Sequence, residues 1–156
     1  MIGPVSWQKA QNSDSTEIKA LIRRVMAEFG FTSSGPVLDA MPDPDAFNAL
    51  GFLGVLRFQE YIMGTYAFLP LSEDTVEIQK IYLVPELRGN HLGREMMKQL
   101  ERIVSSRGFK KITMLSSGRY QAALRLYDQL GYVRLHRPED TSAFCDWQLE
   151  KVLLDD

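Results

Sequence analysis

The sequence predicts a single α+β domain over residues 1–156, and three observations support that fold class. The chain length suits one domain, and the hydrophobic (45%) and charged (24%) fractions are those of an ordinary globular protein. Strand-like runs with a period of two and helix-like runs do not alternate strictly, as they would in a doubly wound sheet. One β-α-β unit follows a series of antiparallel strands. We therefore expect a mixed central sheet of about seven strands flanked by helices.

The first third of the chain predicts a short strand, a helix and a loop. "VSWQKA" (5–10) reads as the strand. Asp14 and Glu17 indicate a capping box at the start of the helix, and Gly30 indicates a glycine cap at its end. Residues 31–51 are rich in turn formers, so we expect a loop with a short helix around 44–50. The helix itself is predicted by apolar residues at helical spacing: Ile18, Leu21, Ile22, Val25, Met26 and Phe29.

Three strands are expected next. "FLGVLRF" (52–58) and "YIMGTYAFLP" (61–70) are joined by a two-residue turn and predict a hairpin. "TVEIQKIYLV" (75–84) predicts a third strand. Pro85 has no backbone N–H for a ladder hydrogen bond, so this strand should end there.

The remaining elements follow from the same patterns, with Gly108 and Gly131 as helix-ending glycines. They are a helix over 92–107, a strand over 110–115, a helix over 122–130 and strands over 132–137 and 143–153. The last strand is expected at an edge of the sheet, where it can pair between subunits of a homodimer.

Composition and charge exclude several classes of protein. The formal net charge is −2, without the clustered basic excess of a nucleic-acid surface. The N-terminus lacks the pattern of a secretion signal, and no window approaches 18 apolar residues. Cys145 is the single cysteine, so no internal disulfide can form, and we expect it in the core. His91 and His136 have no clustered ligands, so no metal site is expected. We expect a soluble, cytoplasmic protein with no membrane or nucleic-acid partner.

The stretch "ELRGNHLGREMMKQL" (86–100) places two glycines directly before a helix. The first N–H groups of that helix lack intrahelical partners and carry the positive end of its dipole. Gly89 and Gly93 remove side chains that would block close approach, and Arg88 adds a positive charge. These features suit a phosphate or diphosphate. The alternative is that the glycines only shape a tight turn. Neither a Walker P-loop nor a Rossmann fingerprint is present.

Two motifs resemble those of the GNAT superfamily of N-acetyltransferases. "VPELRGNHLG" (84–93) is similar to the acetyl-CoA loop [Q/R]-x-x-G-x-[G/A], and "AALRLYDQLGYV" (122–133) is similar to the A-x-x-L-Y-x-x-x-G-[FY] helix and strand. The resemblance covers residues 50–135 and implies the GNAT-like acyl-CoA N-acyltransferase fold, with acetyl-CoA as co-substrate. The residues that it implies in cofactor binding are Tyr82, Leu83, Val84, Arg88, Gly89, Asn90, His91, Leu92, Gly93, Arg94 and Tyr120.

Two positions depart from the family pattern. His91 stands where the motif has its middle glycine, so a positive φ would be strained there, although His tolerates it better than most residues. His91 is either a solvent-pointing residue or an imidazole near the diphosphate. Tyr120 stands where the family often has an Asn that contacts the pantetheine arm, and a phenol can also donate a hydrogen bond.

The resemblance implies acetyl transfer to a primary amine by direct attack. The sheet would splay beside strand 75–84, leaving a backbone N–H near Leu83 for the thioester carbonyl. Glu77 would be the general base, on the same face as Leu83 if the strand alternates regularly. Tyr127 would be the general acid, since a phenol stays protonated at neutral pH. The alternatives are a solvated carboxylate for Glu77 and a core tyrosine for Tyr127.

The resemblance implies that the acceptor enters from the side opposite the cofactor, between residues 29–47 and 137–143, with His136 near the acceptor cleft. Acidic residues there would favour a cationic amine, unless they are only solvated loop acids. The sequence leaves open whether the acceptor is a small molecule or a peptide amine. A rival hypothesis is a non-catalytic acyl-CoA-binding or regulatory module on the same fold, and a third is a nucleotide-binding α/β domain without a link to CoA. The acidic residues are Asp39, Asp43, Asp45, Glu139 and Asp140.

Overall fold

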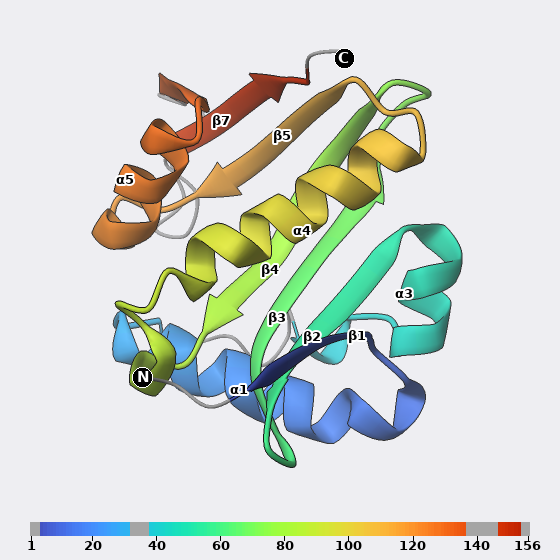
Figure 1. The fold of residues 1–156 in the computed structure, drawn as a ribbon, viewed down its shortest axis with the longest axis vertical. Helices are drawn as coiled ribbons and strands as arrows, with labels where there is room; N and C mark the ends of the chain where they lie inside the picture. Colours follow the sequence, from blue (N-terminus) through green and yellow to red (C-terminus); the bar gives the residue numbers. More distant parts are fainter. Residues whose placement is uncertain (1–3, 32–37, 137–146, 154–156) are drawn as a thin grey trace.

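The computed structural model describes residues 4–31, 38–136 and 147–153, and its centre is a twisted seven-stranded sheet (Figure 1). The strand order is β1-β2-β3-β4-β5-β7-β6. Every neighbouring pair is antiparallel except β4 and β5, which run parallel. The expected mixed sheet and α+β class are confirmed.

The elements lie close to the expected bounds. The strands are β1 (Val5–Lys9), β2 (Phe52–Phe58), β3 (Tyr61–Pro70), β4 (Thr75–Leu83), β5 (Lys111–Ser116), β6 (Val133–His136) and β7 (Trp147–Val152). The helices are α1 (Ser15–Glu28), α3 (Pro44–Leu50), α4 (Leu92–Ser106) and α5 (Gln121–Gln129), with 3₁₀ turns η1 (Asn12–Asp14) and η2 (Pro85–Leu87). Left-handed glycines follow α1, α4 and α5, as predicted: Gly30, Gly108 and Gly131.

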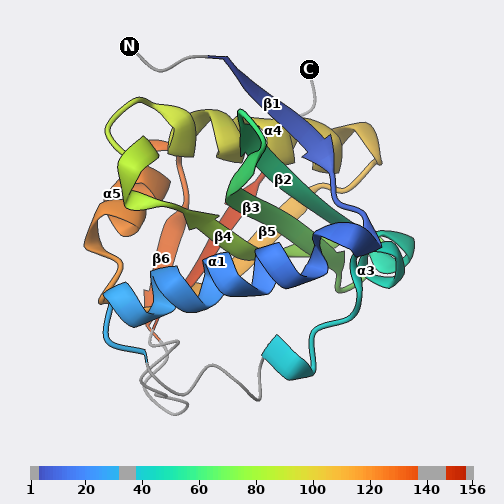
Figure 2. The ribbon, with the colours of Figure 1, turned by 90° about the horizontal axis from the view of Figure 1, so that it is seen from below.

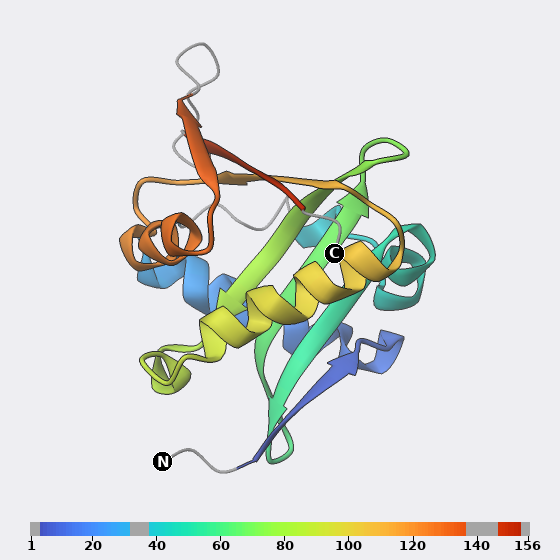
Figure 3. The ribbon, with the colours of Figure 1, turned by 45° about the horizontal axis from the view of Figure 1, so that its top comes forward.

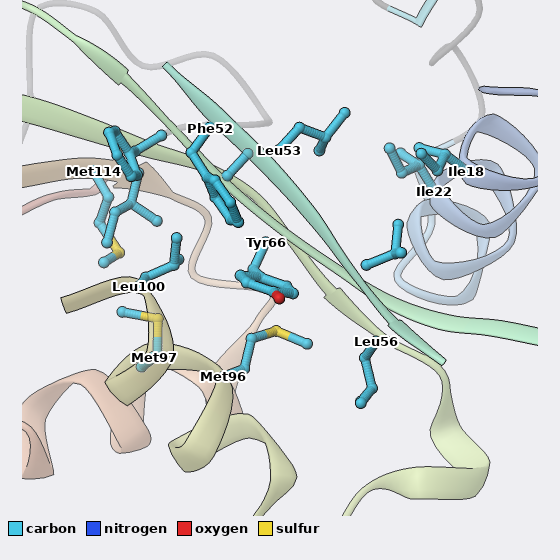
Figure 4. Close-up of a cluster of buried hydrophobic side chains, with 14 of the residues drawn as sticks. Ile18, Ile22, Phe52, Leu53, Leu56, Tyr66, Met96, Met97, Leu100 and Met114 are labelled. Atoms are coloured by element: carbon cyan, nitrogen blue, oxygen red, sulfur yellow. The ribbon is translucent and has the colours of Figure 1, made fainter. Parts of the chain in front are cut away.

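The helices cover both faces of the sheet. Figure 2 shows α1 along one face and α4 along the other. Successive side chains of a strand point to opposite faces of the sheet, so they pack alternately against α1 and α4. Leu53 points toward α1, where Ile18 and Ile22 are buried, and Phe52 and Tyr66 point toward α4 (Figure 4). The face of α4 that packs on the sheet is fully buried at Met96, Met97, Leu100 and Val104.

The predicted capping box is wrong. The Asp14 carboxylate accepts from the Gln11 backbone N–H at 2.9 Å and pairs with Arg57 at 2.5 Å. Glu17 instead accepts from the backbone N–H of Ile62 at 2.8 Å. Both acids therefore join the start of α1 to distant segments. Helical spacing could not reveal the bonds from Arg57 and Ile62, because these donors lie 43 and 45 residues away in sequence.

The expectation that the last strand forms an edge is also wrong. β7 inserts between β5 and β6 and pairs antiparallel with both. Within the described residues, β1 and β6 form the edges of the sheet. Residues 143–146 of the expected strand lie outside the described part of the chain. β7 therefore offers no free edge for pairing between subunits.

Candidate active site

The two parallel strands of the sheet separate halfway along β4. β4 pairs with β5 only from Thr75, opposite Lys111, to Ile78, opposite Met114. Beyond Ile78 the strands diverge, as Figure 3 shows for β4 in light green and β5 in orange. The splay that the family resemblance implied is therefore present.

A β-bulge lies in β4 where the strands separate. Ala67 of β3 lies opposite Gln79, but Thr65 lies opposite Tyr82, so β4 has one extra residue between these pairs. Lys80 within this segment has a left-handed backbone, with φ 56°.

The bulge changes which side chains of β4 share a face. Glu77, opposite Leu69 of β3, shares its face with Gln79 and Tyr82. Leu83 lies opposite Gly64, on the other face. The expectation that Glu77 and Leu83 lie on one face is wrong, because it assumed a regular strand.

A cavity of about 400 Å³ lies between the separated strands. Its walls come from the second half of β4, the end of β5, the loop before α4, the start of α4, α5 and the end of α1. Nine of the expected site residues line it: Tyr82, Leu83, Arg88, Gly89, His91, Gly93, Arg94, Tyr120 and Tyr127. Four others, Glu77, Val84, Asn90 and Leu92, are not among its lining residues.

The loop before α4 has two left-handed residues. Gly89 has φ 81° and His91 has φ 62°. A side chain at Gly89 would meet no atom within 4 Å, so this side of the loop is open. His91 is exposed and immediately precedes α4, so the middle position of the motif does require a positive φ here. The first N–H groups of α4 and this open loop together favour an anion.

Polar side chains hold the loop in place. The Asn90 amide donates to the carbonyls of Leu87 (3.4 Å) and Arg88 (3.1 Å). Arg94, in the first turn of α4, donates to the neutral side chain of Gln129 at 2.6 Å. Its positive charge therefore stays at the rim of the cavity, where the sequence predicted an anion site.

Arg88 has several partners within the protein. Its Nε donates to the Leu83 carbonyl at 3.0 Å, and its terminal nitrogens bind Glu28 at 2.5 and 3.0 Å. The guanidinium also lies 5.4 Å from the centre of the Phe29 ring. Arg88 thus joins the end of β4 to α1, and Glu28 balances its charge.

Tyr127 lies on the inward face of α5, as its helical spacing predicted. The residue is 5% exposed, and its ring packs edge-on against Tyr132 with centroids 5.9 Å apart. Burial raises the pKa of Tyr127 above its ordinary range, and nearby Tyr82 raises it further. The phenol therefore keeps its proton at neutral pH and borders the cavity.

Glu77 is linked to the cavity through Gln79, which the sequence analysis missed. The Gln79 amide donates to a Glu77 carboxylate oxygen at 2.5 Å, and Gln79 lines the cavity. A carboxylate accepts only, so this contact fixes the amide nitrogen toward Glu77. The signal in the sequence was the i, i+2 spacing of two polar residues on one strand.

An aromatic cluster joins the end of α1 to the start of α5 beside the cavity. The Tyr120 ring lies 4.8 Å from Phe29 and 5.6 Å from Phe31, measured between centroids. Arg119 lies 4.6 Å from the centre of the Phe31 ring. Tyr120 therefore has a packing role in addition to its place in the cavity wall. Sequence analysis gave no role to Phe31 or Arg119.

The acidic residues expected on the acceptor side do not line this cavity, which the sequence analysis assigned to the cofactor. Asp43 and Asp45 lie at the start of α3, which contacts β2, β3 and η1. Asp39 is exposed and is not a lining residue. Two further acids of that set and the single cysteine, Glu139, Asp140 and Cys145, lie outside the described residues. Glu77 and Glu28 both bond to side chains that line the cavity, Glu77 to Gln79 and Glu28 to Arg88.

Two further classes of site are absent from the described part of the chain. None of its helices combines the length and the apolar character that crossing a membrane requires. Nor does it hold a group of three or more His, Cys, Asp or Glu side chains that could bind a metal ion. His136 lies on β6 opposite Trp147, apart from His91.

Comparison with solved structures supports the fold. An acetyltransferase of the GNAT family from Staphylococcus aureus Mu50 superposes with a TM-score of 0.84 and 13% identity, covering 97% of this chain and 100% of that one. The yncA protein from Salmonella typhimurium, solved with its cofactor acetyl-CoA, has a TM-score of 0.74 at 16% identity, over 99% and 96% of the two chains. The PaiA N-acetyltransferase from Thermoplasma acidophilum, in complex with coenzyme A, has a TM-score of 0.74 at 14% identity, over 96% and 99%.

Comparison of sequences gives the family. An uncharacterized N-acetyltransferase of Escherichia coli K12, YjgM, is 27% identical over an alignment of 127 residues, and the match covers 76% of this chain and 76% of that protein. The model of the acetyltransferase (GNAT) family matches residues 19–132. This match includes α4, α5 and all of β4, the elements that build the cavity. The chain belongs to the acetyltransferase (GNAT) family.

Proposed function

We propose that the protein transfers the acetyl group of acetyl-CoA to a primary amine. The observation that carries this proposal is the cavity between the splayed halves of β4 and β5. The cavity extends from the start of α4, which favours an anion, to the buried and protonated phenol of Tyr127. Two proteins of the same fold were solved with acetyl-CoA or coenzyme A, which supports this choice of co-substrate.

The loop before α4 is the proposed site for the diphosphate of coenzyme A. Gly89 offers an open approach, the first N–H groups of α4 donate, and Arg94 supplies positive charge. His91 lies at the opening and can contact the phosphates. Arg88 acts here mainly through its bonds to Leu83 and Glu28, which hold the loop against β4.

The second half of β4 is the proposed site for the pantetheine arm and thioester. This segment has β3 on one side and has lost β5 on the other, so its outer edge can pair with an extended ligand. Tyr82 and Leu83 supply the backbone of this segment, whereas the Val84 N–H is already paired with the Met63 carbonyl of β3. A backbone N–H near Leu83 stabilises the oxyanion, a contribution that commonly reaches about 3 kcal/mol of the barrier.

The chemical step forms a C–N bond and breaks a C–S bond. The neutral amine attacks the thioester carbonyl, and Glu77 accepts a proton from it. Because Gln79 lies between Glu77 and the cavity, this transfer passes through a water molecule. Collapse of the tetrahedral intermediate expels the thiolate of coenzyme A, and Tyr127 donates its proton to the sulfur.

The double substitution Glu77→Gln with Tyr127→Phe tests this mechanism. We expect kcat to fall by at least about 100-fold, because each general acid or base commonly contributes 10²–10⁴-fold. The assay follows free thiol release with acetyl-CoA and a panel of amines, and calorimetry follows CoA binding. The matched control is Glu73→Gln with Tyr61→Phe, which makes the same changes at exposed positions.

Three outcomes would contradict the proposal. Unchanged turnover in the double variant would remove Glu77 and Tyr127 from the mechanism. A wild-type protein that binds CoA but acetylates no amine would be the regulatory module instead. Better protection from heat by ATP than by CoA would favour the nucleotide-binding alternative.

A further inference from the structure

We propose that Thr65 is a positioning residue for acetyl transfer. It lies outside the cavity and holds the β-bulge of β4 in place. The catalytic part of this inference rests on the proposed function. The structural part, that the Thr65 hydroxyl fixes the bulge, stands independently of it.

The Thr65 hydroxyl is fully buried and has a specific partner. The residue is 0% exposed, and its Oγ1 donates to the Lys80 carbonyl at 2.7 Å. A buried hydroxyl is unfavourable unless it is hydrogen-bonded. The neighbours of Thr65 on β3 that point to the same face include Ala67, and Val55 lies opposite it on β2. A hydroxyl beside these apolar side chains needs a hydrogen-bond acceptor, and the Lys80 carbonyl is that acceptor.

The partner of that hydroxyl is the unusual residue of β4. A bulge leaves its extra residue out of the regular ladder, so the ladder cannot satisfy all of that residue's backbone groups. Lys80 also has a left-handed backbone, a conformation that persists in a non-glycine residue only when its surroundings favour it. The bond from Thr65 stabilises this conformation from the side of the strand opposite β5.

The position of the bulge decides what faces the cavity. β4 is paired regularly before the bulge, up to Gln79 opposite Ala67, and again after it, where the Val84 N–H donates to the Met63 carbonyl at 3.0 Å. The extra residue is therefore confined to the segment that lines the cavity. If the bulge were lost, the register after it would slip by one residue, so the side chains of the strand end would exchange faces and its N–H groups would exchange edges. Thr65 thus fixes the orientation of Tyr82 and Leu83 without touching either substrate.

Two substitutions separate the hydroxyl from packing. Thr65→Val keeps the shape and removes the hydroxyl, whereas Thr65→Ser keeps the hydroxyl and removes a methyl group. We expect Thr65→Val to lower kcat by about 10-fold or more, while KM for acetyl-CoA changes by less than about threefold. Contacts to the transition state depend strongly on the exact position of Leu83, whereas binding of acetyl-CoA depends on it less. Thr65→Ser should recover most of kcat. Val55→Ala, a buried change opposite Thr65, controls for lost stability.

Hydrogen–deuterium exchange provides the readout that does not need activity. In Thr65→Val the amides of residues 79–83 should exchange at least about 10-fold faster, while those of residues 75–78 stay unchanged. Wild-type kcat in Thr65→Val, or an equal loss of kcat in Thr65→Ser, would overturn the catalytic inference. Unchanged exchange at 79–83 would overturn the structural one. A wild-type protein without transferase activity would remove the proposed function, and the exchange experiment would still decide the role of Thr65.

Discussion

The two halves of β4 differ in pairing, in burial and in backbone conformation. Thr75–Ile78 has a strand on each side and alternates regularly, with Val76 and Ile78 buried. Gln79–Leu83 has only β3 beside it, contains the bulge, and is partly exposed at every position. The same strand thus contributes to the core with its first half and to the cavity with its second. The site therefore depends on the separation of β4 from β5 within the sheet, rather than on a separate loop.

Backbone hydrogen bonding explains why the interruption is useful. A central strand uses both of its edges to pair with its neighbours, so a ligand finds no free donors there. Where β5 departs, the outer edge of β4 no longer has that neighbour, and an extended ligand can replace it. Gly64 allows α4 to pack closely behind this region, because a side chain there would approach Met96 within 2.8 Å.

The largest expected effect is a loss of stability from the first half. Val76→Ala removes two buried methyl groups from a fully buried position, so the free energy of unfolding should fall by about 2 kcal/mol. Turnover should stay near the wild-type value at temperatures where the variant is folded. Urea unfolding and thiol-release assays measure the two effects. A tenfold loss of kcat in folded Val76→Ala would contradict the assignment of a structural role to the first half of β4.

The next effect is a loss of activity from the second half. Gln79→Met keeps the length of the side chain and removes the bond to Glu77, so we expect kcat/KM to fall by about 10-fold, or about 1.4 kcal/mol. The free energy of unfolding should change by less than about 1 kcal/mol, because Gln79 is only partly buried. Gln99→Met is the matched control, since the partly buried Gln99 amide donates to the Glu95 carboxylate on α4 at 3.3 Å and neither residue lines the cavity. Equal losses of activity in both variants would contradict the role of Gln79.

These two halves also show what the sequence could predict. The first half of β4 follows the period-two pattern, and its strand assignment is confirmed. The glycines of the loop and the inward position of Tyr127 could also be predicted, because local backbone sterics and helical spacing determine them. His91 stands where the motif has its middle glycine, and its backbone has the positive φ that a glycine there would adopt without strain.

The second half could not be predicted, because long-range contacts determine it. The bulge at Lys80 has no local signal, since lysine does not favour φ > 0, and its partner Thr65 lies 15 residues earlier. The insertion of β7 between β5 and β6 is a topological choice that strand patterns do not encode. The motif likewise does not predict the pairing of Arg88 with Glu28, because it requires only Gln or Arg at that position.

A smaller effect comes from Tyr66, the β3 residue at the register shift between the two halves. Burial raises the pKa of Tyr66 to about 12. The unfolded chain releases this proton near pH ~10 while the folded protein retains it, so the stability that it contributes is present below that pH and is lost as the pH rises toward ~12. Between pH ~10 and ~11 the free energy of unfolding should therefore fall by about 1 kcal/mol less in Tyr66→Phe than in the wild type.

Urea unfolding at the two pH values measures this difference. Tyr127 and Tyr132 also have raised pKa values, but they are present in both proteins, so their contributions to the pH dependence cancel in the comparison. Tyr61→Phe, an exposed position, should follow the wild type. Identical pH dependence in Tyr66→Phe and the wild type would show that this phenol ionises alike in both states.

The smallest effect concerns the backbone, and it should change sign between the halves of β4. At Lys80 a glycine adopts the left-handed conformation without strain, so Lys80→Gly should be more stable than Lys80→Ala by about 0.5 kcal/mol, after the greater freedom of glycine in the unfolded chain is subtracted. At Thr75, in the regular half, Thr75→Ala should be more stable than Thr75→Gly by a similar amount. The interactions of the original side chain cancel at each position, because neither the glycine nor the alanine variant can make them. Urea unfolding of the four variants measures both differences. If glycine were the less stable residue at both positions, the bulge would not hold its backbone in the left-handed region in solution, and the division of β4 into a structural and a functional half would lose its physical basis.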